Sequence, residues 1–173
     1  MNKIFDTRKT VLTAILACMA LCIYAIEYLI PFPVPIPGAK IGLANTVTLA
    51  AFYIVGKKRA FSVIIVRIIL SALLFGNMMS LAYSISGGIL CYVVIFMLSF
   101  IAGEEHIWAL GVFGALAHNL GQVLMAVAVL GDFSIMYYYL YLIVISVFAG
   151  SFTGLCAAFT VKAFRKTKLK NYL

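Results

Sequence analysis

Charged side chains are scarce in this sequence. Lysine, arginine, aspartate and glutamate make up only 10% of the 173 residues, whereas 65% are hydrophobic and the mean hydropathy is +1.14. So few charges exclude a soluble globular domain, in which about a quarter of the residues are charged. Because a hydrocarbon core of about 30 Å requires roughly 20 apolar residues per helix, this length predicts an all-α integral membrane protein with about six spans.

Carboxylates are rarer still, and none of them belongs to a catalytic motif. The five acidic residues are Asp6, Glu27, Glu104, Glu105 and Asp132. They do not form the carboxylate cluster that holds Mg²⁺ in prenyl or phosphoryl transfer. The sequence also has no GxxxxGK[ST] phosphate loop and no Ser/His/Asp or Cys/His spacing typical of a nucleophile. We therefore predict no catalytic residue, no metal, no cofactor and no enzyme activity of the chain on its own.

The cysteines lack the spacing of a disulfide framework or a metal site. Cys18, Cys22, Cys91 and Cys156 lie inside apolar runs, with no CxxC pair and no neighbouring histidine. Free cysteines of this kind are typically small buried hydrophobic residues. We predict that role for all four.

One membrane domain, residues 1–173, is predicted from six apolar runs with short connections. The predicted helices cover about 10–30, 41–55, 61–75, 81–100, 108–130 and 133–159. The first run is too long for a signal peptide and has no A-x-A cleavage site at its end, so we expect a retained helix. The connection 31–38, PFPVPIPG, alternates proline with apolar residues and predicts a stiff, extended wall or lid outside the membrane.

The lysines and arginines indicate how the chain is oriented. The amino terminus, the second connection and the carboxyl tail carry 3, 3 and 5 of them, against Lys40 alone on the other side. Cytoplasmic segments are rich in Lys and Arg, so both termini are predicted to be cytoplasmic. The acidic Glu104 and Glu105 fall on the same predicted side, but acids contribute little to this rule. The net charge of +8 therefore indicates topology and not nucleic-acid binding.

Two charged side chains fall inside apolar runs. Glu27 lies near the end of the first run and Arg67 in the third. An ionisable group in the hydrocarbon costs several kcal/mol unless it faces the bundle interior or water, so both residues are predicted to bind a ligand. The alternative is an ion pair between them that only joins two helices.

Uncharged polar residues extend the candidate site. His118 and Gln122 are four residues apart and share one helix face, and Asn119 is adjacent to His118. Asn45 interrupts the outer end of the second run, at a similar predicted depth. Contact with a ligand and hydrogen bonds between helices both suit Asn119 and Gln122.

Small residues recur every four positions on two predicted helices. Gly150 and Gly154 form a GxxxG pattern that Ala158 continues, and Gly111 and Ala115 form a similar pair. Such rows allow close approach of helices in membranes. We favour packing inside the bundle, with contact to a partner subunit as the alternative.

Three ordered blocks carry a family resemblance. PIPGAKIGLANTVTLAAFYIVG, LLFGNMMSLAYSISGG and AHNLGQVLMA closely resemble the bacterial Gx transporter family, also labelled heptaprenyl diphosphate synthase component I. That family is similar in size and layout to the substrate-binding S components of energy-coupling factor (ECF) vitamin transporters, which are six-helix bundles with an outward-facing pocket. The resemblance implies pocket residues at Lys40, Asn45, Asn77, His118, Asn119 and Gln122.

The resemblance also implies a function and partners. It suggests a multi-pass subunit of the bacterial plasma membrane that captures a small molecule from outside. An amphipathic or aromatic ligand, such as a vitamin-like or quinone-precursor compound, suits the many Tyr and Phe residues and the mixed charge of Glu27, Lys40, Arg67 and Asp132. The partners of the subunit would be membrane lipid and either an ECF-type transmembrane coupling subunit with ATPases or further copies of the chain. The alternative is an accessory membrane subunit of heptaprenyl diphosphate synthase. A third hypothesis is a scaffold whose small-residue faces bind other helices and whose interior is dry and fully paired.

Overall fold

The computed structural model describes residues 2–29, 42–75 and 78–167, and this part of the chain consists of helices joined by short connections, without strands. The predicted all-α class is confirmed there. The helices are α1 (Asn2–Leu29), α2 (Asn45–Ile54), α3 (Lys57–Phe75), α4 (Met78–Leu98), α5 (Ile107–Leu130) and α6 (Tyr138–Lys166), with short 3₁₀ turns η1 (Glu104–His106) and η2 (Phe133–Tyr137).

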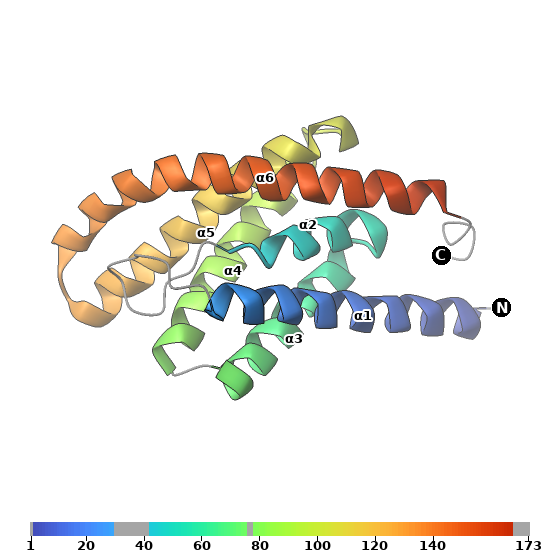
Figure 1. Cartoon of the computed structure of the whole chain (residues 1–173), viewed down its shortest axis with the longest axis horizontal. Coiled ribbons are helices and arrows are strands. Elements are labelled where there is room, and N and C mark those ends of the chain that lie inside the picture. The colour runs from blue at the N-terminus through green and yellow to red at the C-terminus, as the bar shows by residue number, and fades with distance from the viewer. Residues whose placement is uncertain (1, 30–41, 76–77, 168–173) are drawn as a thin grey trace.

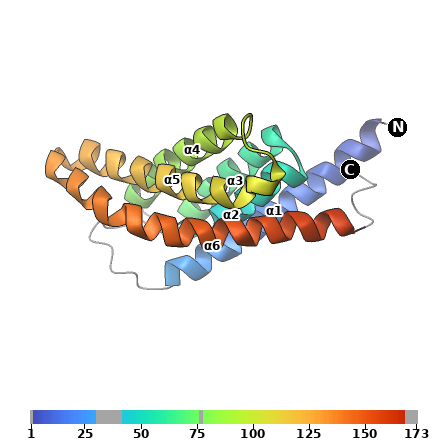
Figure 2. The same ribbon diagram turned by 90° about the horizontal axis from the view of Figure 1, so that it is seen from above.

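The short helix α2 lies between the two longest helices, α1 and α6 (Figure 1). It contacts both of them as well as α3 and α5. The helices α4, α5 and α6 lie side by side and form one wall of the bundle, as Figure 2 shows. The helix α3 packs against α1, α2 and α4. The helix α2 is therefore surrounded by protein, and its amino-terminal end faces the interior.

The helix bounds differ from those predicted at several ends. The helix α1 begins at Asn2 and not near residue 10, and α6 continues to Lys166 and not 159. The basic turn predicted before the third helix is its first turn, because α3 begins at Lys57. Hydropathy marks only the apolar part of a helix, whereas backbone hydrogen bonding continues through polar residues at the membrane surface.

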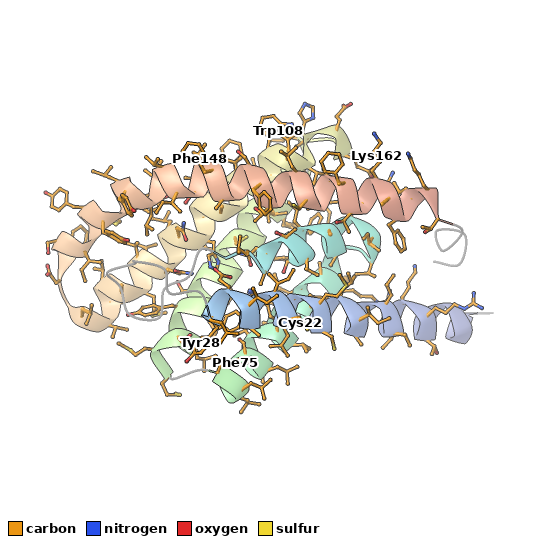
Figure 3. All side chains as sticks on the ribbon, in the orientation of Figure 1. Cys22, Tyr28, Phe75, Trp108, Phe148 and Lys162 are labelled. Atoms are coloured by element: carbon orange, nitrogen blue, oxygen red, sulfur yellow. The ribbon has the colours of Figure 1, made fainter. Side chains whose placement is uncertain are left out.

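Within the described ranges, four helical segments are long and apolar enough to cross a membrane: Thr7–Leu29, Met78–Leu98, Glu104–Leu130 and Phe133–Lys166. The helix α2 is not among them, since its 10 residues rise only about 15 Å. Many large apolar side chains lie on the outer surfaces of the long helices, as Phe148 of α6 illustrates (Figure 3). The protein is thus a membrane-embedded helix bundle.

The polar connections gather at one end of the bundle. The first turns of α1 and the last turns of α6 lie at the same end (Figure 1). There Arg165 of α6 forms an ion pair with Glu104 of η1, and Lys57 donates a hydrogen bond of 2.9 Å to Ser99 Oγ. Glu104, in the acidic connection after α4, is therefore paired with the basic end of α6. This arrangement is the one expected if both termini lie on one side of the membrane.

An aromatic cluster surrounds Lys57 at this end. Its ammonium nitrogen lies 4.0 Å from the ring centroid of Phe100, 4.7 Å from that of Phe96 and 5.4 Å from that of Phe52. Cations are attracted to the negative faces of aromatic rings at these distances. This contact fastens the turn between α2 and α3 to the end of α4.

The glycine rows pack inside the bundle. A Cβ atom added to Gly111 of α5 would collide with the backbone of Gly154, and one added to Gly150 of α6 would lie 2.6 Å from Val112 Cα. The backbones of α5 and α6 therefore touch along these positions. The prediction of internal packing is confirmed for this pair of helices.

The prediction that all four cysteines are buried is wrong for two of them. Cys91 is buried and Cys156 partly so, but Cys18 and Cys22 are exposed on α1. The helix α1 buries the opposite stripe, which includes Ala17 and Ala20, against α2 and α3. In a membrane protein the lipid-facing surface is as apolar as the interior, so an apolar neighbourhood in the sequence does not indicate burial in protein.

Candidate ligand-binding site

The candidate site is built around the turn that precedes α2. Gly42 has a φ of +87°, a left-handed conformation that favours glycine. The N–H groups of Asn45 and Thr46 donate to the carbonyl oxygens of Gly42 and Leu43, at 2.9 and 3.0 Å. This turn leaves the N–H groups of Gly42 and Leu43 themselves directed away from α2.

Glu27 of α1 accepts both of these N–H groups. The nitrogen of Gly42 lies 2.6 Å from Oε1 and that of Leu43 lies 3.1 Å from Oε2. The amino-terminal end of a helix carries a partial positive charge, so a carboxylate is stabilised there. Glu27 is only 8% exposed. The sequence-predicted residue is therefore buried and holds α1 to the start of α2.

The imidazole ring of His118 lies between Gly42, in the turn before α2, and Gly87 of α4. A Cβ atom on Gly42 would lie 2.9 Å from His118 Cδ2, and one on Gly87 of α4 would lie 2.8 Å from His118 Nδ1. Neither position accommodates a side chain without displacing the ring. No pattern in the sequence singled out these two glycines, yet they confine the imidazole ring on both sides.

His118 and Gln122 are in direct contact on the shared face that their spacing predicted. The amide nitrogen of Gln122 lies 2.6 Å from His118 Nε2. Since an amide nitrogen only donates, this contact makes Nε2 the acceptor and places the imidazole proton on Nδ1. Within the described part of the chain, Nδ1 is buried and has no hydrogen-bond partner. The site therefore contains an unused buried donor.

Arg67 of α3 is the second group with unused donors. The side chain is 3% exposed, and neither Nε nor Nη2 has a hydrogen-bond partner among the residues that the structure describes. Its charge interacts with the carboxylate of Glu27 and with His118. Leaving a buried guanidinium without hydrogen bonds is energetically costly, because its hydration is lost without replacement.

Asn119 faces a different partner. Its amide nitrogen donates a hydrogen bond of 2.7 Å to Ser146 Oγ of α6, and that hydroxyl donates to the carbonyl oxygen of Leu142 at 2.6 Å. Asn119 is 2% exposed and Ser146 is fully buried. Of the two roles considered for Asn119, the structure shows the bond between helices. No pattern in the sequence singled out Ser146.

Asn45 lies beside a very small cavity. The void is lined by the first turn of α2 and by α4, α5 and α6, and its volume of about 10 Å³ is comparable to the space needed by one water. Cys91 and Thr153 contribute to its wall. A larger molecule at this position requires the surrounding helices to separate.

The two remaining predicted residues, Lys40 and Asn77, lie outside the described residues, as does the predicted wall or lid at 31–38. The structure brings together Glu27, Asn45, Arg67, His118 and Gln122 around the start of α2, and turns the amide nitrogen of Asn119 toward α6. Among the described residues, no three His, Cys, Asp or Glu side chains are arranged to hold a metal ion.

Comparison with known proteins identifies one family. A family model described as heptaprenyl diphosphate synthase component I matches residues 16–160, which is most of the chain. No curated protein and no solved structure matches this chain. The matched range includes every residue of the candidate site.

Proposed function

The chain belongs to the heptaprenyl diphosphate synthase component I family, and we propose that it is a membrane substrate-binding subunit for transport. It captures a small vitamin-like or quinone-precursor molecule from outside the bacterial plasma membrane. The observation that carries this proposal is the buried polar cluster around the start of α2. In the described part of the chain, Nε and Nη2 of Arg67 and Nδ1 of His118 have no hydrogen-bond partner in this cluster.

The unpartnered donors favour ligand binding over a purely structural role. A scaffold would gain stability from an interior in which every polar group is paired. Arg67 and His118, in contrast, retain buried donors without partners among the described residues. Polar and ionisable residues inside membrane bundles mark substrate pathways, since their cost is otherwise uncompensated. A ligand with acceptor atoms satisfies these donors and offsets that cost.

Energy for transport would come from separate subunits. The chain has no phosphate-binding loop, so nucleotide hydrolysis requires another protein. An ECF-type coupling subunit with its ATPases supplies this activity in the proposed assembly. The small cavity beside Asn45 implies that binding requires the helices to separate, and a coupling subunit is suited to control such a movement.

A second candidate function is an accessory membrane subunit of heptaprenyl diphosphate synthase, which the description of the family favours. In that role the chain would bind a lipid product or anchor a soluble catalytic chain. Mixing the purified protein with the catalytic component and measuring chain elongation separates the two functions. A transport subunit leaves the elongation rate unchanged, whereas an accessory subunit changes it.

The binding role is tested by native mass spectrometry of protein purified from its own membranes. We expect the wild-type protein to retain a small molecule and the Gln122→Leu variant to lose it. Asn119 is not the residue to replace, because its bond to Ser146 joins α5 and α6. Ser151→Ala serves as a control, since this exposed hydroxyl bonds only within α6. A wild-type protein without any retained molecule, or equal retention by the Gln122 variant, contradicts the proposal.

A further inference from the structure

The unpartnered nitrogens of Arg67 lie on one edge of its guanidinium group. Nε and Nη2 are neighbours in the planar group, and their N–H bonds on this edge point in the same direction. Together they form a bidentate donor pair, called the fork below, that matches the two oxygens of a carboxylate. In the described part of the chain both nitrogens are buried and neither has an acceptor.

Glu27 does not bond to Nε or Nη2, although its charge acts on Arg67. Its two oxygens accept the N–H groups of Gly42 and Leu43. The carboxylate therefore supplies compensating charge to Arg67, while Nε and Nη2 remain without hydrogen bonds. The charge of Arg67 is balanced, but its hydrogen-bonding capacity is not.

The surrounding charges also favour an anion. Glu27 and Arg67 cancel one another, and His118 is neutral when its Nε2 accepts from Gln122. The amino-terminal end of α2 adds a partial charge of roughly +0.5. A singly charged anion leaves a net charge of similar magnitude, whereas a doubly charged phosphate leaves a larger negative excess. A planar carboxylate thus suits both the charge and the shape of the fork.

From this geometry we propose that Arg67 binds a carboxylate group of the substrate through Nε and Nη2. The inference rests on the proposed substrate-binding function and restricts the substrate class to monocarboxylates. His118 Nδ1 is a third donor in the same interior, available to a further acceptor atom of the substrate. In this role Arg67 recognises the carboxylate group of the substrate.

Matched pairs of compounds test the proposal directly. The full chain, purified in detergent, is heated with benzoate or benzamide, nicotinate or nicotinamide, and 2-naphthoate or 2-naphthamide. In each pair only the carboxylate presents two equivalent anionic oxygens. We expect at least one carboxylate to raise the melting temperature, and its amide to raise it much less. Inorganic phosphate is the comparison for a general anion effect.

Variants distinguish the effect of the two parallel donors of Arg67 from the effect of its positive charge. Arg67→Lys keeps a positive charge but lacks the two parallel donors, so we expect binding of the active carboxylate to weaken by about ten- to a hundredfold. Arg59→Lys makes the same chemical change in the first turn of α3 and should leave binding unchanged. The proposal is overturned if acid and amide stabilise the protein equally, or if Arg67→Lys and wild type bind the carboxylate equally. It is also overturned if only phosphate stabilises the protein, or if none of the carboxylates does.

A measurement on the wild-type protein keeps the proposal testable even if Arg67→Lys does not fold. The small molecule retained in native mass spectrometry is released and fragmented, and we expect it to lose carbon dioxide. A retained molecule without a carboxyl group, released by Gln122→Leu, overturns the carboxylate proposal while supporting the binding function. A protein that retains no molecule contradicts both.

Discussion

The carboxylate of Glu27 accepts a hydrogen bond of 2.6 Å from the backbone nitrogen of Gly42, across 15 positions of the chain. A second bond from Leu43 completes the contact. Through this contact the end of α1 and the start of α2 form one unit, which lies against His118 of α5. Several consequences of this arrangement are open to measurement.

Replacing Glu27 by glutamine should destabilise the protein. The variant keeps an acceptor oxygen but loses the negative charge that favours the amino-terminal end of α2 and Arg67. Because hydrogen bonds to charged groups contribute about 1.5–3 kcal/mol, we expect a clear fall in the melting temperature of the purified protein. Glu105→Gln, at an exposed position in η1, is the matched control. Equal melting temperatures for the two variants would show that the Glu27 charge is unimportant.

An added methyl group at Gly87 should displace His118. The new Cβ would lie 2.8 Å from Nδ1 and 2.9 Å from the backbone oxygen of the same residue, so rotation of the ring alone cannot relieve the clash. Overpacking of this kind costs about 1–3 kcal/mol. We expect Gly87→Ala to lower the melting temperature and reduce ligand retention in native mass spectrometry. Gly103→Ala, where the atom nearest to the new Cβ is 3.5 Å away, should change neither the melting temperature nor ligand retention. Ligand retention equal to wild type in Gly87→Ala would refute the role of Gly87 in positioning His118.

Asn119 and Ser146 should be energetically coupled. The amide of Asn119 donates to the hydroxyl of Ser146, so either alanine variant removes the same bond. In a double-mutant cycle we expect a coupling of about 0.6 kcal/mol, with roughly 1.7 kcal/mol as an upper bound for such bonds in membranes. Asn119→Ala combined with Ser151→Ala should show additive effects, because Ser151 bonds within α6. Additivity in both cycles would mean that the bond contributes nothing to stability.

Lys57 should contribute more to stability than its neighbour Lys58. Its ammonium group contacts the ring of Phe100 at 4.0 Å and Ser99 Oγ at 2.9 Å, whereas Lys58 is exposed. A cation on an aromatic face contributes about 0.5–2 kcal/mol. We expect Lys57→Met to lower the melting temperature and Lys58→Met to leave it within error of wild type. A larger loss in the Lys58 variant would contradict this assignment.

Composition and local spacing were sufficient for the general architecture. Apolar runs predict helices in a membrane because each residue type contributes its own transfer free energy, independently of distant residues. The contact of His118 with Gln122 follows equally from the sequence, since residues four apart on a helix are neighbours in any fold. The family resemblance was likewise present in the order of the motifs, and residues 16–160 match that family.

Contacts between helices required the tertiary structure, because they depend on the rotation and depth of each helix relative to its neighbours. The sequence allowed Glu27 to pair with Arg67, but packing places its oxygens on the amides of Gly42 and Leu43. It allowed Asn119 to contact either a ligand or a helix, and the approach of α6 gives it Ser146. The sequence also did not determine which face of α1 is exposed, since lipid and the protein interior are both apolar. Only packing could show that the donors on one edge of Arg67 have no partner among the residues that the structure describes.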